Sequence, residues 1–526
     1  MSGIVISYRR EDTEGSAGRL YDRLVERYGR ELVFMDFYSI GSGEDWGAEI
    51  DRVIARSSVL LALIGPRWAS ATDQNGRRWL EVEGDYVRRE IRTALQQGIH
   101  VVPVLVQSAR MIESSALPAD LAGLGAMQAI VLDSWHYDRD VERLSRLLDA
   151  AMDVGGEIPG LDPRRTAVAA FVGCAERGPI GQPWRVTQWA EYLHEFGRNG
   201  RSFLPRSVYA WFCNGGGACY IVRVGDDTAP PAPEVLRKRI SGALLDLLSF
   251  GEVTILAAPD VLWLYEANLC DLEFVRDCQI AMIAHCGRML NRVSLLDGPR
   301  GLSPQQFAEF RERLLPDDAK FATLYYPWIV DSFGQYNPPS GVVAGMWAGS
   351  DAAAGVWAPP ANRPLQGVNN LEVVVGRHDW DLLQAKGINV LLQVPGRGIV
   401  ASGARTLGDK HDSHSRDLAT VRLAGALGEL VRRATSWAAF ERSNKATWRR
   451  LTETLEAILQ TLWQQGAFAG ERPSDAFFVK CDDEVNVAEV IDSGVIQAEF
   501  GFAPKIPGYF VKMQIEQPSG DVTHFA

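Results

Sequence analysis

The chain has 526 residues, which is too long for one hydrophobic core and predicts about two to four domains. Hydrophobic residues make up 46% of it and charged residues 23%, as in ordinary globular proteins. The formal net charge of −12 argues against a nucleic-acid backbone as the main partner.

Neither a membrane span nor a metal site is indicated. No stretch reaches the roughly 18–20 uninterrupted apolar residues of a membrane-spanning helix, and the first residues lack the charge pattern of a signal peptide. We therefore expect a cytoplasmic protein with no membrane partner. The seven cysteines are widely spaced and form no C-x-x-C pair, so we predict neither a disulfide framework nor a bound metal.

The first 150 residues alternate short apolar runs with amphipathic stretches. The apolar runs predict strands, at residues 4–8, 32–37, 59–64, 100–106 and 129–132. The amphipathic stretches predict helices, at residues 17–28, 46–55, 86–97 and 140–152. Because almost wholly apolar strands alternate with helices, we expect an α/β, flavodoxin-like fold with a five-stranded parallel sheet covered on both faces.

Glycine and proline are concentrated at residues 154–165, which predicts a linker. Further strands are predicted at residues 167–172, 219–224, 253–257, 477–481, 495–500 and 509–515. Further helices are predicted at residues 234–248, 417–436 and 444–465. We divide the chain into a first domain at 1–153, the linker at 154–165, a middle region at 166–370 and a C-terminal domain at 371–526.

Unusual polar and aromatic residues follow the first three predicted strands. They include Tyr8 after the first strand, Asp36 at the end of the second, and Trp68 and Glu90 after the third. In a doubly wound sheet of strand order 2-1-3-4-5, ligands bind beyond the carboxyl ends of strands one and three. Three loops are therefore expected to converge on one cleft with aromatic rings, several arginines and one carboxylate.

These loops resemble the bacterial branch of the TIR family. The segment ISYRRED at residues 6–12 looks like its opening motif, and LIGPRW at 63–68 followed by YVRREI at 86–91 looks like its catalytic segment. HVVPVL at 100–105 matches the next strand, and the resemblance covers about residues 2–152. Enzymatic TIR domains cleave the bond between nicotinamide and ribose in NAD. The resemblance thus implies that NAD is the substrate, with no other cofactor, and that Glu90 is the catalytic residue.

The implied chemistry suits a carboxylate. Departure of neutral nicotinamide leaves an oxocarbenium-like ribose, whose charge a fixed carboxylate stabilises. We expect Asp85 to cap the helix that carries Glu90. Two alternatives stay open: a glutamate in a helix is usually a solvated surface residue, and some TIR domains act only as scaffolds.

The resemblance also implies a set of substrate-binding residues: Tyr8, Arg9, Arg10, Asp36, Trp68 and Tyr86. Trp68 or Tyr8 would stack on the nicotinamide or ribose, and the two arginines would pair with the pyrophosphate. Equally, Trp68 can belong to the core, the arginines can form surface salt bridges, and Asp36 can satisfy loop amides. The sequence GSG at 41–43 replaces the family's usual proline, so we expect a more mobile loop there.

The remainder resembles the sheath proteins of contractile phage tails and related injection machines. The motifs that carry the resemblance follow one order: TAVAAFVG at 166–173, YPW at 326–328, GVWAPPAN at 355–362, KGINV at 386–390, GARTL at 403–407 and AFFVKCD at 476–482. The match spans about residues 160–520 and implies an α+β, tail-sheath-like region that polymerises. The segment 509–515 is either a strand exchanged between neighbours or an ordinary internal strand.

Three interpretations of function follow. In the first, an NAD-cleaving enzyme self-assembles through its sheath-like part into a homo-oligomer or filament, and assembly activates the TIR domains in anti-phage defence. Phage tail sheath or tail components are possible further partners in this case. The second is a structural sheath subunit of a contractile injection system with a non-catalytic TIR domain, and the third is a signalling scaffold. The sequence HDSH at 411–414 invites a metal or triad interpretation, but a solvated loop is favoured there.

Overall fold

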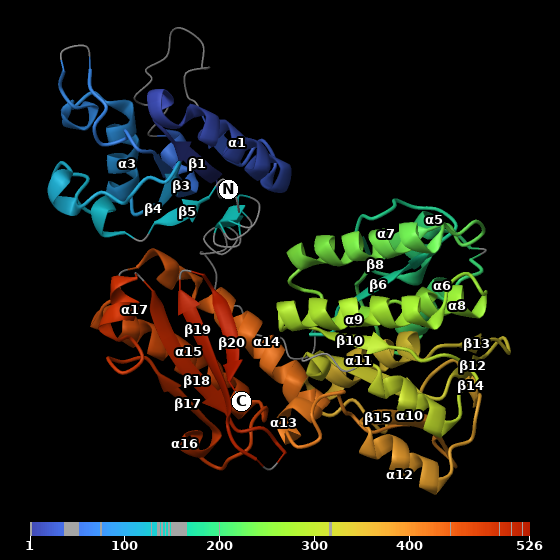
Figure 1. The fold of residues 1–526 in the computed structure, drawn as a ribbon. Coiled ribbons are helices and arrows are strands. Elements are labelled where there is room, and N and C mark those ends of the chain that lie inside the picture. Colours follow the sequence, from blue (N-terminus) through green and yellow to red (C-terminus); the bar gives the residue numbers. More distant parts are fainter. Residues whose placement is uncertain are drawn as a thin grey trace.

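The structure is a computed structural model of the whole chain (Figure 1). It describes residues 3–525 with the exception of 36–51, 74–75, 128, 134–136, 138–139, 142–143, 146–147, 149–165, 199, 315–317, 442, 494, 507 and 518. The predicted linker at 154–165, most of the predicted helix at 46–55 and Asp36 therefore lie outside the described residues.

The first part of the chain is a parallel five-stranded sheet with the strand order β2-β1-β3-β4-β5. This order confirms the flavodoxin-like fold that the sequence predicts. The elements are β1 (Gly3–Ser7), α1 (Arg10–Tyr28), β2 (Val33–Met35), β3 (Ser57–Ile64), α3 (Tyr86–Gln96), β4 (His100–Val106) and β5 (Ile130–Leu132).

Alternation along the strands divides this core into two layers. Ile4 and Ile6 belong to the apolar cluster that α1 covers, whereas Val5 belongs to the cluster that α3 covers. Successive side chains of a strand point to opposite faces, so a strand covered by helices on both sides must be apolar at every position. This is why β1 and β3 are continuous apolar runs.

The middle part is built around an eight-stranded sheet in the order β16-β15-β11-β10-β9-β6-β8-β7. Its inner strands are parallel, while β7 and β16 at the two edges pair antiparallel to their neighbours. A small sheet, β13-β12-β14, lies beside it. The strands are β6 (Ala169–Cys174), β7 (Trp184–Val186), β8 (Cys219–Gly225), β9 (Ile255–Ala257), β10 (Val293–Leu296), β11 (Ala322–Tyr326), β12 (Ile329–Asp331), β13 (Tyr336–Asn337), β14 (Val368–Leu371), β15 (Ile388–Val394) and β16 (Gly398–Ser402).

Helices cover this sheet. They are α5 (Trp189–Phe196), α6 (Leu204–Cys213), α7 (Pro233–Asp246), α8 (Asp260–Glu266), α9 (Leu272–Met289), α10 (Pro304–Glu312), α11 (Ser340–Ala354) and α12 (Arg377–Ala385). Strands β15 and β16 belong to this sheet, so the division that the sequence analysis places at residue 370 is wrong. The apolar core of the middle part extends to Val421, and the next core begins at Leu423 of α14 (Leu418–Ala434).

Helix α11 lies in a glycine-rich region where the sequence analysis predicts no helix. Gly341, Gly345 and Gly349 follow one another at four-residue spacing and face α6. A Cβ atom at Gly345 would lie 2.6 Å from the backbone oxygen of Trp211. The stripe of glycines lets the two helix backbones approach more closely than side chains permit, and this packing outweighs the low helix propensity of glycine.

The C-terminal part is an antiparallel sheet, β17-β18-β19-β20, with α14 and α15 on one face. Its elements are α13 (Ser413–Arg416), α14, η7 (Ser436–Phe440), α15 (Lys445–Gln464), α16 (Pro473–Ala476), β17 (Phe477–Lys480), α17 (Ala488–Asp492), β18 (Ile496–Phe502), β19 (Val511–Gln517) and β20 (Asp521–Phe525). Strand β19 pairs with β18 and β20 of the same chain, so the segment predicted at 509–515 is an internal strand.

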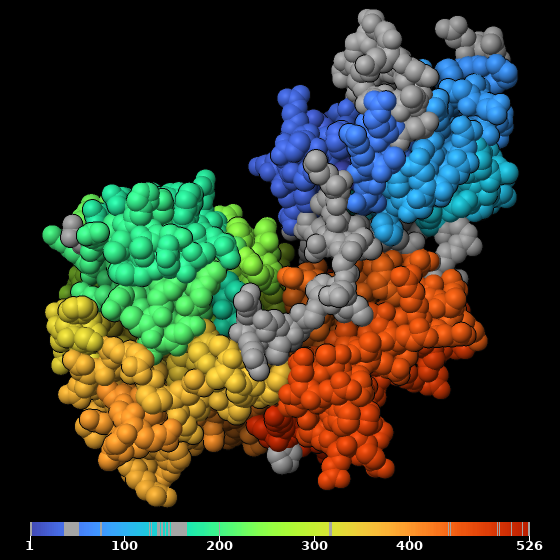
Figure 2. All heavy atoms as spheres, turned by 180° about the vertical axis from the view of Figure 1, so that it is seen from behind, coloured from blue at the N-terminus to red at the C-terminus, as the bar shows by residue number. Residues whose placement is uncertain are grey.

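The first part rests on the C-terminal part, as the blue and orange regions of Figure 2 show. Ala439 of η7 is buried in the apolar cluster of the first sheet, next to β4. Burial lowers the pKa of His100, the first residue of β4, and the nearby charge of Glu441 opposes that shift. The contact therefore uses the end of the sheet where β4 begins.

Candidate functional site

The candidate site lies at the carboxyl ends of the strands of the first sheet, where helix α3 begins. Asp85 is the N-cap of α3, since its Oδ2 accepts a hydrogen bond from the backbone N–H of Arg88 at 3.1 Å. This confirms the predicted cap. The buried stripe of α3 consists of Val87, Glu90, Ile91 and Ala94, at the spacing of one helix face.

Glu90 is thus a carboxylate on the apolar face of its helix. Only 8% of its surface is exposed, whereas a solvated surface glutamate would be mostly accessible. The alternative of a solvated residue is therefore contradicted. Burying an ionisable group costs free energy unless its surroundings compensate it, so a glutamate at such a position is more typical of function than of stability.

Arg9 connects the loop after β1 to the start of α3. Its guanidinium donates two hydrogen bonds to Asp85, from Nη1 to Oδ1 at 3.1 Å and from Nη2 to Oδ2 at 2.9 Å. Both side chains are 7% exposed. In this structure the guanidinium of Arg9 is bound to a carboxylate that sets the position of α3, and its predicted pairing with a pyrophosphate stays a prediction.

The loops after β1 and β3 also contact one another. The backbone N–H of Arg67 donates to Oδ1 of Asp12 at 3.0 Å, and a Cβ atom at Gly65 would lie 2.4 Å from Oδ2 of Asp12. Glycine is therefore required for this close approach. The loop after β4 joins them, since Nε2 of Gln107 donates to the carbonyl of Asp12 at 3.3 Å. Of the three loops predicted to converge, those after β1 and β3 are therefore in contact, whereas the loop after β2 lies outside the described residues.

Asp12 is a site residue that the sequence analysis does not single out. Its side chain is 2% exposed, and Oδ2 has no hydrogen-bond partner within the described part of the chain. The available signal was its place in the ISYRRED motif and in the first turn of α1. An acidic residue there is usually explained by the helix dipole alone, so the motif was the only indication.

The remaining predicted residues are placed differently. Trp68 is fully buried in the apolar cluster that also holds Val87 and Ile91. In this structure it is therefore a core residue, which is the second of the two roles considered for it. Tyr8 is half-buried against the cluster on the α1 side of the sheet. Arg10 and Tyr86, the first residues of α1 and α3, are exposed, and Asp36 lies outside the described residues.

The HDSH sequence at 411–414 has a structural role. Oδ1 of Asp412 accepts hydrogen bonds from the backbone N–H groups of His414 and Ser415, at 2.9 Å and 3.2 Å, and so caps the short helix α13. A cap of this kind is the usual function of an aspartate in this position.

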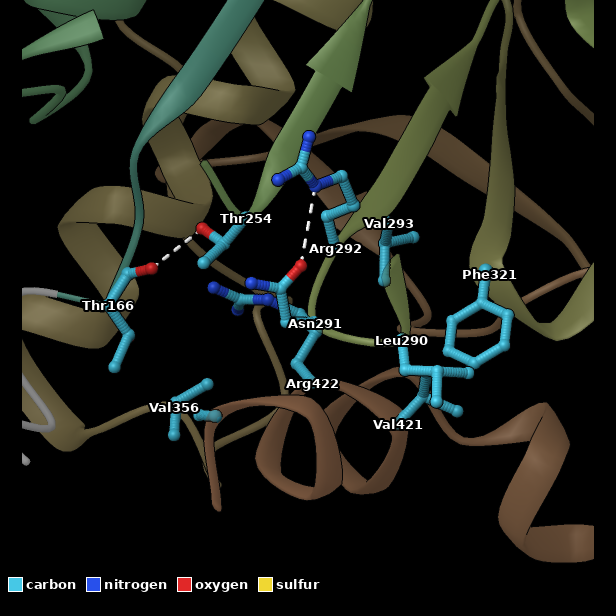
Figure 3. A pocket seen from close by; sticks show the side chains of 11 residues that line it. Thr166, Thr254, Leu290, Asn291, Arg292, Val293, Phe321, Val356, Val421 and Arg422 are labelled. Carbon is cyan, nitrogen blue, oxygen red and sulfur yellow. Dashed lines mark hydrogen bonds between the residues drawn. The ribbon is translucent and has the colours of Figure 1, made fainter. Parts of the chain in front are cut away.

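A small cavity lies where α14 meets the middle part (Figure 3). Its lining includes Thr166, Thr254 and Arg422, and its volume of ≈ 10 Å³ leaves room for about one water molecule. Beside it, Arg422 forms a buried ion pair with Asp351, with 3.0 Å between Nη1 and Oδ1. The cavity is too small for a substrate.

Comparisons with known families divide the chain in the same way. The TIR domain family matches residues 4–148, and the phage tail sheath protein central domain matches residues 275–407. A Pseudomonas aeruginosa protein named as a prophage major tail sheath protein is 25% identical over 185 residues, which are 34% of this chain and 45% of that protein. The chain thus spans less than half the length of that curated relative.

Solved structures resemble the part that follows the TIR domain. The anti-feeding prophage helical sheath in its contracted state is 28% identical, with a TM-score of 0.54, over 66% of this chain and 92% of the other. The sheath complex of an extracellular contractile injection system, PVC, is also 28% identical, with a TM-score of 0.51, over 65% and 89%.

No helix in the described ranges is both long and apolar enough to cross a membrane. The sheet topology and the two family matches agree on the organisation of the chain. It combines a TIR domain at residues 4–148 with a region that resembles phage tail sheath proteins.

Proposed function

We propose that the TIR domain cleaves NAD between nicotinamide and ribose and that Glu90 is the catalytic residue. The observation that carries this proposal is the burial of Glu90 on the apolar stripe of α3, the helix whose start Arg9 ties to the loop after β1. When nicotinamide leaves as a neutral group, positive charge develops on the ribose. A carboxylate held in a partly dry site stabilises that charge without having to reorganise, and this lowers the barrier to cleavage.

The surrounding contacts support a fixed position for this carboxylate. The N-cap bond of Asp85 sets where α3 begins, and the paired hydrogen bonds from Arg9 anchor that cap to the loop after β1. Glu90 follows within the first turns of the same helix. A rigid helix start holds a catalytic group more accurately than a loop does.

The sheath-like part, in this proposal, assembles copies of the chain and so activates the TIR domains. Support comes from the relatives, of which one is a helical sheath. Assembly raises the local concentration of TIR domains and brings neighbouring copies into contact. NAD loss in an infected cell would then serve defence against phage, with phage tail sheath or tail components as partners that promote assembly.

The test compares nicotinamide release by the full chain, by Glu90→Gln and by Glu83→Gln. Glu83 is an exposed carboxylate in the loop before α3, so its variant makes the same chemical change outside the site. We expect Glu90→Gln to lose at least about a hundredfold in rate and Glu83→Gln to match the wild type. Release that is equal in all three proteins would exclude a catalytic role for Glu90.

Assembly is tested with the same proteins. Specific activity should rise with protein concentration in parallel with the particle size measured by light scattering, because assembly precedes catalysis in this proposal. Activity per subunit that stays constant while particles grow would contradict activation by assembly and would leave the role of Glu90 intact.

A further inference from the structure

A second candidate site lies in the sheath-like part, far in sequence from the TIR domain. It is a hollow of ≈ 570 Å³ between the end of α10, the 3₁₀ helix η6 (Ala319–Phe321), the end of α12 and the segment from Leu407 to α13. Its cationic lining residues are Arg311, Lys320, Lys386, Lys410 and Arg416. Two carboxylates, Asp409 and Asp412, also line it.

The carboxylates are already used by the backbone around them. Asp412 caps α13, as described above, and Oδ1 of Asp409 accepts a hydrogen bond from the backbone N–H of His411 at 2.9 Å. Among the cations, Lys386 is paired with Glu312. Apart from this pair, four cationic side chains and two carboxylates line the hollow, so it carries an excess of positive charge.

Arg311 is a buried guanidinium whose hydrogen bonds are incomplete. It is 9% exposed, and its Nη2 donates to the carbonyl oxygen of Leu407 at 2.9 Å. Its Nε has no partner in the described part of the chain. A buried charged donor without an acceptor costs on the order of 1–3 kcal/mol, so the hydrogen-bonding capacity of this guanidinium is not fully used.

Arg416, the last residue of α13, also lines the hollow and shows the same pattern. Its Nη2 donates to the carbonyl oxygen of Gln384 at 3.1 Å and to that of Ala385, while its buried Nε has no partner among the described residues. Burial lowers the pKa of Arg416, the charges of Arg405 and Arg311 lower it further, and the charge of Asp409 opposes the shift. The charge of Arg416 is therefore repelled by two other guanidinium groups, of which Arg405 shares its acceptor at Gln384.

Neutral carbonyl groups are the acceptors for all three arginines. Nη1 of Arg405 also donates to the carbonyl oxygen of Gln384, at 3.1 Å. Within the described residues, no carboxylate forms a salt bridge with Arg311, Arg405 or Arg416. The charges of Asp409 and Glu312 offset part of this repulsion without forming salt bridges to the arginines, so an anion that accepts hydrogen bonds from the guanidinium groups would be favourable here.

We propose that this hollow binds a small phosphate anion, held by the guanidinium groups of Arg311 and Arg416. A phosphate carries between one and two negative charges at neutral pH and presents several acceptor oxygens, so it can accept hydrogen bonds from two guanidinium groups at once. Lys410 is exposed at the mouth of the hollow and adds a flexible charge. Free phosphate and a diphosphate share this chemistry.

The test is isothermal titration of the full-length protein with inorganic phosphate or inorganic pyrophosphate. Sodium chloride at the same ionic strength is the reference. We expect saturable binding of one or both phosphate compounds and none of chloride. Tighter binding of pyrophosphate than of phosphate assigns the site to diphosphates. Tighter binding of phosphate assigns it to the free phosphate ion.

Variants locate the binding. Arg416→Gln should weaken it by at least about tenfold, since charged hydrogen bonds are lost. Arg313→Gln is the matched control, because Arg313 is exposed next to Arg311 on the same segment but does not line the hollow. Lys410→Gln, at an exposed position that leaves the fold intact, should weaken binding about threefold. Equal affinity in Arg416→Gln, Lys410→Gln and Arg313→Gln, or no difference between phosphate and chloride, would overturn the proposal.

Discussion

The ion pair between Arg9 and Asp85 gives a quantitative test of how the candidate site is held. Both side chains are 7% exposed, and two hydrogen bonds join them. Breaking a buried pair by removing one partner costs about 3–5 kcal/mol, since a charge is left without its counter-ion. Asp85 keeps the backbone N–H of Arg88, so we expect Arg9→Met to cost about 3 kcal/mol, at the lower end of that range.

Native-state hydrogen exchange of the full chain measures this cost where it arises. The amides of β1 and α3 should exchange faster by the factor that corresponds to about 3 kcal/mol, roughly 150-fold, while the sheath-like part is unchanged. The double variant Arg9→Met, Asp85→Asn leaves no unpaired charge and retains a capping oxygen. We therefore expect it to be less destabilised than the sum of the two single variants.

A surface ion pair of the same domain is the control. Arg78 and Glu81 form a salt bridge, but their side chains are 44% and 51% exposed. Water and salt screen such a pair, so Arg78→Met should cost less than about 1 kcal/mol. If Arg9→Met proves no more costly than Arg78→Met, then the Arg9–Asp85 pair does not hold the start of α3 and the reasoning fails.

Two further predictions concern the sheath-like part. Gly345→Val should lower its free energy of unfolding by about 1–3 kcal/mol in urea denaturation, because the new side chain meets the backbone of α6. Gly242→Ala on α7 is the control, because a Cβ there meets nothing within 4 Å. It should raise the free energy of unfolding by up to about 1 kcal/mol. His285 accepts a hydrogen bond from Arg292 through Nε2, and burial, with the charges of Arg292 and Arg288, lowers its pKa to about 3. Its folded pKa lies below the unfolded value of 6.5, so its contribution is complete above pH 6.5 and is lost as pH falls toward 3. The loss reaches up to about 3 kcal/mol by pH 4. This loss of stability, measured by urea denaturation at several pH values, should be smaller in His285→Gln than in the wild type. Identical pH profiles for the wild type and His285→Gln would refute the role of His285.

The strands of the TIR domain could be located from sequence because they are buried on both faces. Their apolar runs have sharp ends, and the predicted strand at 100–106 coincides with β4. The cap by Asp85 was also predictable, since it depends on residues three positions apart. Local patterns of this kind carry most of what sequence alone can show.

Features that depend on distant residues were not predictable. Arg9 and Asp85 are 76 positions apart, and no local pattern indicates that one neutralises the other. Helix α11 was missed because its glycines look like a loop until α6 is known to lie against them. The boundary at residue 370 was wrong for a related reason. The sequences of β15 and β16 do not indicate whether these strands extend the middle sheet or begin another one.

The contact between η7 and the start of β4 determines which way the TIR domain faces. Parallel strands share one direction, so the rim that carries Glu90 is opposite the rim that rests on the sheath-like body. The body therefore does not cover the rim that carries Glu90. In an array of copies, the rim with Glu90 would face away from the sheath-like part of the same chain. It would be accessible to the TIR domain of the next copy or to a dinucleotide in solution.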